Sequence, residues 1–136
     1  TYLRIGKSDR PSVHSVGPKS IDFACTRKTG ARSVIVGTGS MSSTALQIGS
    51  ELGADSISFI RIKPFPEKFI SEIASYEKVF VLEEHHGSGG LYSAIAENLL
   101  SEETKAKHPA IARPLIYSIS LRDRFAQQCG GHDFAL

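Results

Sequence analysis

The stretch Lys78–Leu100 constrains the fold more than any other part of this chain. The apolar run Val79–Leu82 has the length and composition of a buried β-strand. Two acids and two histidines follow at 83–86, and a glycine-rich turn at 87–90 leads into apolar positions spaced as on one face of a helix. A strand, a polar loop, a glycine turn and a helix in this order are typical of α/β proteins. These proteins place binding and contact residues at the carboxyl ends of their strands.

The alternation of strand and helix repeats along the rest of the chain. The predicted strands lie at 21–26 (a short edge strand), 33–36, 56–62, 79–82 and 115–121, with helices at about 42–52, from Pro66 onward and from Leu91 onward. A serine at 40, 42 or 43 could cap the first helix, and Gly53 is placed to end it. A charged loop is expected at 101–109. Strands separated by helices of this length form a mostly parallel sheet with helices on both faces. The sequence therefore predicts a three-layer α/β/α fold around a mostly parallel sheet of roughly five strands.

The N-terminal region suggests a domain boundary. Residues 1–6 have strand-like composition, and residues 7–20 are polar and contain two prolines, as in a linker. We expect residues 1–20 to be the end of a preceding domain plus a linker, and residues 21–136 to be the main domain. Because the chain begins with Thr1 in the middle of a strand-like segment, we expect a fragment of a longer polypeptide.

Composition excludes several classes of protein. The 136 residues are 40% hydrophobic and 22% charged, which is ordinary for a globular domain with a real core. A net charge of +2 with no Lys/Arg run predicts neither a nucleic-acid partner nor a membrane partner. Cys25 and Cys129 show neither metal-ligand spacing nor a disulfide framework, so a cytoplasmic location is the default expectation.

Two glycine-rich turns could bind an anion or could simply be tight turns. Gly37–Ser40 lies between a strand and a helix, where backbone N–H groups can hold a phosphate. It does not complete the GxGxxG fingerprint, because Ser42 occupies the place of the third glycine. The turn at 87–90 lacks the lysine of a phosphate loop. We favour tight turns without a ligand in both places, and keep an anion-binding regulatory module as the alternative.

The acids and histidines of the polar loop are the main candidates for chemistry. Glu83, Glu84, His85 and His86 could bind zinc, but adjacent histidines on an extended segment point to opposite sides. No nucleophile or base partner is visible for a proton shuttle. We therefore predict no catalytic residue and no metal ligand in this chain, and interpret the loop as a contact surface.

Several segments together resemble the C-terminal domain of the transketolase family. The strand and turn at 34–40 resemble its first main strand. The acid-rich strand end at 81–85, followed by Gly89, Gly90 and the small-residue helix at 91–97, is similar to its most recognisable signature. Residues 122–125 with Gly130 resemble its closing element, and Tyr2–Lys7 resembles the last strand of the preceding pyrimidine-binding domain.

The resemblance implies that cofactor binding and domain packing belong to different domains of the enzyme. In this family thiamine diphosphate and Mg are bound by other domains through a GDG…NN motif that is absent here, so the fragment alone should bind no cofactor and be inactive. It implies a packing and dimerisation domain of an enzyme that transfers two-carbon ketol units between sugar phosphates. The partners would be other domains or subunits of that enzyme, with a homodimer in the full-length form. Related members are 1-deoxyxylulose-5-phosphate synthase and the beta subunit of 2-oxo acid dehydrogenases.

The resemblance also assigns contact and substrate residues. Gly89 and Gly90 join Glu83, Glu84, His85 and His86 in the expected contact loop. Lys7 falls near an arginine that binds the substrate phosphate in transketolases, and it keeps the charge without the bidentate fork.

Overall fold

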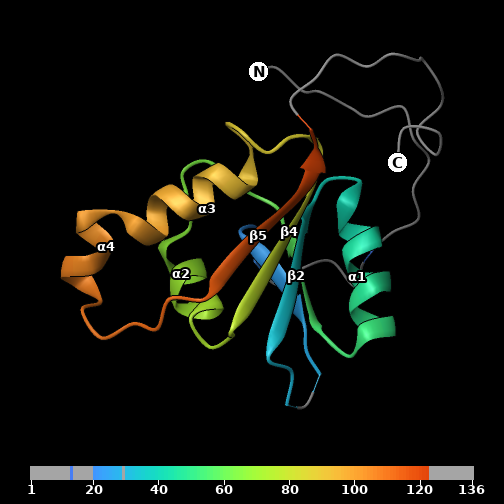
Figure 1. Cartoon of the computed structure of the whole chain (residues 1–136), viewed down its shortest axis with the longest axis horizontal. Helices are drawn as coiled ribbons and strands as arrows, with labels where there is room; N and C mark the ends of the chain where they lie inside the picture. Colours follow the sequence, from blue (N-terminus) through green and yellow to red (C-terminus); the bar gives the residue numbers. More distant parts are fainter. Residues whose placement is uncertain (1–12, 14–19, 29, 123–136) are drawn as a thin grey trace.

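A five-stranded sheet forms the centre of the molecule (Figure 1). The computed structural model describes residues 13, 20–28 and 30–122, and the structure below is that of these residues. The strand order is β1-β3-β2-β4-β5. The strands are β1 (Phe23–Thr26), β2 (Ser33–Thr38), β3 (Asp55–Phe59), β4 (Lys78–His86) and β5 (Leu115–Leu121).

Helices cover both faces of the sheet, which makes three layers. In Figure 1, α1 lies on one side and α2, α3 and α4 lie on the other. The helices are α1 (Met41–Leu52), α2 (Glu67–Ile73), α3 (Leu91–Leu100) and α4 (Glu102–Lys107). Within the described part of the chain, no helix is both long and apolar enough to cross a membrane.

The sheet is parallel except at one edge. β2 pairs in parallel with both β3 and β4, and β4 pairs in parallel with β5. β1 runs antiparallel to β3 at the edge, with Phe23 opposite Phe59 and Thr26 opposite Ser56. The predicted fold class is therefore confirmed, including the short edge strand.

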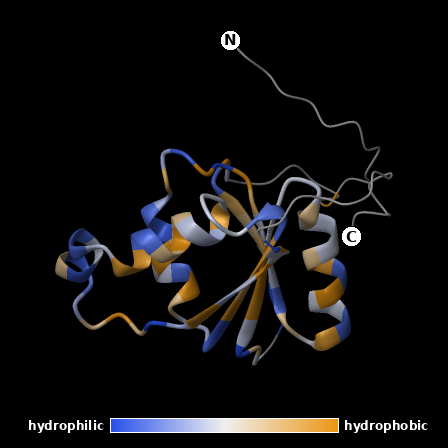
Figure 2. Cartoon of the chain, turned by 45° about the horizontal axis from the view of Figure 1, so that its top comes forward, coloured by the Kyte–Doolittle hydropathy of each residue, from blue (hydrophilic) through white to orange (hydrophobic). Residues whose placement is uncertain are grey.

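Alternate residues of the central strands point to opposite faces of the sheet and belong to two separate hydrophobic cores. Val34, Val36, Val79 and Val81 point to the side of α2 and α3 and are fully buried there. This larger core includes an aromatic group in which the rings of Phe59 and Phe69 meet edge to face with centroids 4.7 Å apart, joined by Phe23 and Phe65. The smaller core, under α1, contains Ile35, Met41, Ala45, Ala54 and Leu82. Figure 2 shows the apolar colour gathered on the strands and on the inner sides of the helices.

The face under α1 is not covered along β5. Along β5 the side chains on this face remain exposed: Leu115 by 60%, Tyr117 by 41%, Ile119 by 52% and Leu121 by 47%. Tyr117 stacks on Phe80 of β4 with ring centroids 5.1 Å apart. These five residues, Phe80 with the four of β5, form what we call the apolar strip.

Three predicted elements differ from the structure. β4 does not end at Leu82 but continues to His86, because β5 pairs with it as far as Leu82 and again, after an irregularity, at His86. The predicted loop 101–109 contains helix α4. β3 is shorter than the predicted 56–62 and ends at Phe59.

The ends of α1 match the prediction only in part. Gly53 ends the helix at φ +67°, the left-handed conformation that glycine adopts without strain. At the other end, Ser40 occupies the cap position but makes no side-chain cap hydrogen bond. The hydroxyls of Ser42 and Ser43 instead donate to the carbonyls of Gly37 and Ser40.

Candidate functional site

The carboxyl ends of the parallel strands lie together at one end of the sheet, and the candidate residues predicted from the sequence lie there. The last residues of β2 and β4 there are Thr38 and His86, and β5 ends at Leu121, which pairs with His86. The polar residues at this end of the sheet belong mainly to β4 and the turn that follows it.

Glu83 is buried, although it belongs to the predicted polar loop. It is 4% exposed and lies on the same face of β4 as Val79 and Val81. Its carboxylate accepts hydrogen bonds from the backbone N–H of Leu91, through Oε1, and from the N–H of Tyr92, through Oε2 at 3.1 Å. A negative charge at a helix N-terminus satisfies free amides and interacts well with the helix dipole. Glu83 therefore anchors α3 to β4.

The glycines of the turn make room for this anchor. A Cβ on Gly90 would fall well inside van der Waals contact with the Glu83 carboxylate. A Cβ on Gly87 would meet the Ser118 hydroxyl of β5 at 2.7 Å. The N–H of Gly89 donates to the hydroxyl of Ser93 at 2.9 Å, and that hydroxyl donates to the Gly87 carbonyl at 2.9 Å. The amides of Gly89, Leu91 and Tyr92 are thus engaged by side chains of the chain itself.

The remaining loop residues lie at the surface. Glu84, His85 and His86 at the end of β4 are exposed. Across residues 13, 20–28 and 30–122, no three side chains of the histidine, cysteine and acidic types come together as metal ligands do. The structure therefore separates Glu83, which serves the fold, from these three side chains, which lie on the surface.

The other glycine turn is also a tight connection. A Cβ on Gly37 would overlap the backbone carbonyl of Met41 and lie 3.0 Å from the Ala45 Cβ. The Ser42 N–H donates to the Gly39 carbonyl at 3.2 Å, and the Ser42 hydroxyl donates to the Gly37 carbonyl at 3.3 Å. Close approach of α1 to β2 accounts for the glycine at position 37. Lys7, the candidate for a substrate phosphate, lies outside the described residues.

A buried polar network lies at the opposite end of the sheet, where β3 begins. It was not predicted from the sequence. Asp55, 4% exposed, accepts a hydrogen bond from the Tyr76 hydroxyl at 2.5 Å and another from the backbone N–H of Lys28. Arg27 reaches the same hydroxyl at 3.3 Å and forms an ion pair with Glu72 at 2.5 Å. Burial, followed by the hydrogen bond to Asp55, raises the pKa of Tyr76. The network joins β1, β3 and the end of α2 and is structural.

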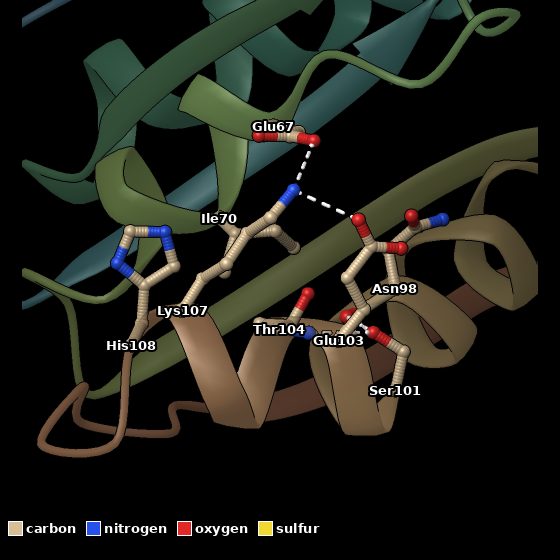
Figure 3. Close-up of a pocket in the computed structure, with 8 residues that line it drawn as sticks. All are labelled: Glu67, Ile70, Asn98, Ser101, Glu103, Thr104, Lys107 and His108. Atoms are coloured by element: carbon tan, nitrogen blue, oxygen red, sulfur yellow. Dashed lines mark hydrogen bonds and ion pairs between the residues drawn. The ribbon is translucent and has the colours of Figure 1, made fainter.

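A polar pocket lies between α2, α3 and α4 (Figure 3). Lys107 stands between two carboxylates, with its Nζ 2.8 Å from oxygens of both Glu67 and Glu103. The hydrogen bonds that Lys107 donates to Glu103 and Glu67 raise the pKa of Lys107, and Lys107 lowers the pKa of Glu67. The cavity holds about 40 Å³.

Comparison with known proteins identifies the family of this chain. The family model described as "Transketolase, C-terminal domain" matches residues 24–122. A curated relative from Stutzerimonas stutzeri, 1-deoxy-D-xylulose-5-phosphate synthase, is 30% identical over 111 residues, which are 81% of this chain and 16% of that protein. The synthase of Xylella fastidiosa is 30% identical over 83% of this chain and 17% of its own. That of Neisseria gonorrhoeae is 32% identical over 66% of this chain and 13% of its own. The chain spans about a sixth of the length of the first two relatives.

Proposed function

Because this chain belongs to the transketolase C-terminal domain family, we propose that it is the packing domain of a larger enzyme that depends on thiamine diphosphate. The observation that carries the proposal is the match over 24–122 together with synthase relatives at 30% identity. The chemistry would belong to other domains, and this domain would complete the assembly.

Among the enzymes of this family we favour 1-deoxy-D-xylulose-5-phosphate synthase. The relatives from three genera described above all carry that name. Transfer of two-carbon ketol units between sugar phosphates, the first expectation from the sequence, becomes the rival. The beta subunit of a 2-oxo acid dehydrogenase is the next alternative, without support from those relatives.

We assign no catalytic residue to this chain. In the turn before α3, the N–H groups of Gly89, Leu91 and Tyr92 already donate to Ser93 and Glu83. These bonds weaken the alternative of an anion-binding regulatory module at this turn. Thiamine diphosphate and Mg would be held by domains other than this one. The free thiol of Cys25 fits a cytoplasmic enzyme.

The contact surface in this proposal is the end of β4 and the turn that follows it. Exposed Glu84, His85 and His86 would face other domains of the same enzyme or a second subunit of a homodimer. Glu83, Gly89 and Gly90 would support this surface from behind, because the anchor on α3 holds the turn in place.

A domain transplant tests the proposal. Residues 21–136 would replace the C-terminal domain of the Stutzerimonas stutzeri synthase, and formation of 1-deoxy-D-xylulose 5-phosphate would be measured. We expect product from the chimera and none from the enzyme without the domain. A chimera that assembles to its native size by light scattering but forms no product, while the same transplant restores ketol transfer in a transketolase, would favour the rival.

The isolated chain provides a second test. Calorimetric titration of residues 1–136 with thiamine diphosphate and Mg should show no binding. Micromolar binding would contradict the assignment of the cofactor to other domains.

A further inference from the structure

The outer edge of β5 differs from the other edge of the described sheet. β5 has seven residues, whereas β1 at the opposite edge has four. Within the described part of the chain, only β4 pairs with β5. The segment Leu115–Leu121 contains no charged residue, no proline and no glycine. Proteins usually protect an edge strand by short length, charged side chains or proline, because a bare edge pairs readily with another strand. β5 has none of these protections, so its edge is suited to strand pairing.

The hydrogen bonds to β4 show which backbone groups of β5 face outward. The N–H of Leu115 donates to the Glu77 carbonyl of the neighbouring chain segment at 2.9 Å. In a parallel pair, alternate residues direct both backbone groups toward the same neighbour. The residues that alternate with Leu115 therefore direct their N–H and C=O groups away from β4. They are Ile116, Ser118 and Ser120.

We propose that β5 pairs antiparallel with β5 of a second copy of this chain, about a two-fold axis at Ser118. In this register Ser118 lies opposite the second copy's Ser118, and Ile116 lies opposite the second copy's Ser120. Residues opposite each other in this way exchange two N–H···O bonds, so all outward backbone groups of β5 gain a partner. The two five-stranded sheets then form one continuous sheet.

The two-fold axis has one position that satisfies the whole edge. With the axis at Tyr117, Ser120 would face residue 114, which is a proline outside β5 and has no N–H. With the axis at Ile119, Ile116 would face residue 122, which also lies outside the strand. The axis at Ser118 keeps every pair within β5.

The side chains match in the same register. Tyr117 lies opposite the second copy's Ile119, and aromatic side chains pair well with β-branched ones across antiparallel strands. Leu115 lies opposite the second copy's Leu121. The apolar strip of one copy thus continues into that of the other, and no like charges meet along the pair. This self-complementarity favours a second copy as the partner, because a two-fold interface uses the same surface of both subunits. The proposal concerns the chain alone and does not rest on the proposed function.

Light scattering and amide exchange of the full chain of 136 residues test the proposal. The measured mass should double as the concentration rises. The amides of Tyr117 and Ile119, which bond to β4, should be protected from exchange at every concentration. The amides of Ile116, Ser118 and Ser120 should become protected only where the dimer forms. A chain that stays monomeric, or a dimer in which these three amides exchange freely, would overturn the proposal.

Disulfide formation tests the position of the axis. In a Cys25→Ala/Cys129→Ala chain, Ser118→Cys should give a covalent dimer with oxidised glutathione. Its Cα would lie about 5.5 Å from that of the second copy, which is within disulfide range. Ser120→Cys is the matched control on the same face. Its counterpart would lie four residues along the ladder, about 13 Å away, so no covalent dimer should form. A covalent dimer of Ser120→Cys, or of neither variant, would contradict the two-fold axis at Ser118.

A charge on the edge strand provides a third test. Ile119 is 52% exposed, so Ile119→Lys can be accommodated in the monomer. The change should raise the dissociation constant of the dimer by about tenfold or more, because it brings two lysines close to the axis. Leu100→Lys, at a residue of α3 that is 57% exposed, is the control and should leave the dissociation constant unchanged. Native signals of Ile95 verify that each variant is folded. An unchanged dissociation constant in folded Ile119→Lys would overturn the proposal.

Discussion

At the scale of single residues, the most consequential side chain is Glu83. Burial of a carboxylate is unfavourable unless hydrogen bonds compensate it. Here two backbone N–H donors compensate it, and the same two bonds satisfy amides that the first turn of α3 leaves free. The acid that first suggests an active site is therefore part of the fold.

Glu83 and Gly90 should be energetically coupled. Glu83→Ala removes the acceptor of two amides and should lower the free energy of unfolding by about 2 kcal/mol. Gly90→Ala should cost a similar ~2 kcal/mol, because its Cβ would displace the carboxylate from those amides. Urea unfolding of the two single variants measures both effects.

The double variant is the sharper test of this coupling. Gly90 has φ −92° and ψ −160°, which alanine adopts without strain. Once Glu83 is alanine, the change at Gly90 should cost less than about 0.5 kcal/mol, since nothing remains to be displaced. Additive costs in the double variant would mean that the carboxylate does not explain this glycine.

Cys25 should be an unreactive thiol. Burial, and next the negative charge of Glu72, raise the pKa of Cys25 from 9.0 to about 11. In a Cys129→Ser chain at pH 8, reaction with an aromatic disulfide should be at least about tenfold slower than in the urea-unfolded chain, because the thiolate is the reactive form. Equal rates would contradict the raised pKa.

The same shift has a consequence for stability. The folded state binds the thiol proton of Cys25 more tightly than the unfolded state does. The resulting contribution to the free energy of unfolding is fully present below about pH 8.5 and is lost as the pH rises through about 11. The melting temperatures of Cys25→Ala and of the parent chain would be measured across this pH interval. The melting temperature of Cys25→Ala should fall less steeply with rising pH than that of the parent chain.

At the scale of elements, the turn between β2 and α1 separates two reasons for a glycine. Gly37 has no space for a Cβ because the Met41 backbone lies against it, whereas Gly39 has open space but a φ of +55°. Gly39→Ala should cost about 1–2 kcal/mol from the left-handed backbone alone. Gly37→Ala should cost more, about 3 kcal/mol, because backbone must move. Chemical denaturation would rank them, and the reverse order would refute this account.

The sequence predicts elements whose signal is local. The apolar run Val79–Leu82 and the helical spacing after Gly90 identify β4 and α3, and Gly53 correctly marks the end of α1. The extension of β4 to His86 was not predictable in the same way. Polar residues 83–86 stay extended because β5, almost thirty residues later in the chain, pairs beside them.

Helix α4 was predicted as a loop although its signals are present. The hydroxyl of Ser101 accepts from the Thr104 N–H at 3.1 Å, acids occupy the first turn and lysines the last. The helix has no buried residue, so hydrophobic periodicity could not reveal it. The Asp55 network escaped prediction for another reason, because Lys28, Tyr76 and Asp55 meet only through the tertiary fold.

At the scale of the whole molecule, the exposed end of β4 should matter for assembly and not for folding. His85→Ala should change the stability of the isolated chain by less than about 0.5 kcal/mol, as expected for an exposed side chain. In the synthase chimera the same change should lower assembly or product formation. Glu51→Ala, an exposed change at the far end of α1, is the matched control and should affect neither. An unaffected His85→Ala chimera would remove this residue from the contact surface.

The strand order has a further consequence, for the route by which the chain folds. In the described sheet every pair of neighbouring strands is separated in sequence by at least one other element, so no pair is a hairpin. Each pairing must close a long loop before any strand contact compensates its entropy. We therefore expect refolding over milliseconds to seconds, as in topologies dominated by distant contacts. β2, which needs partners from both sides, should become protected from hydrogen exchange only when the sheet forms as a unit.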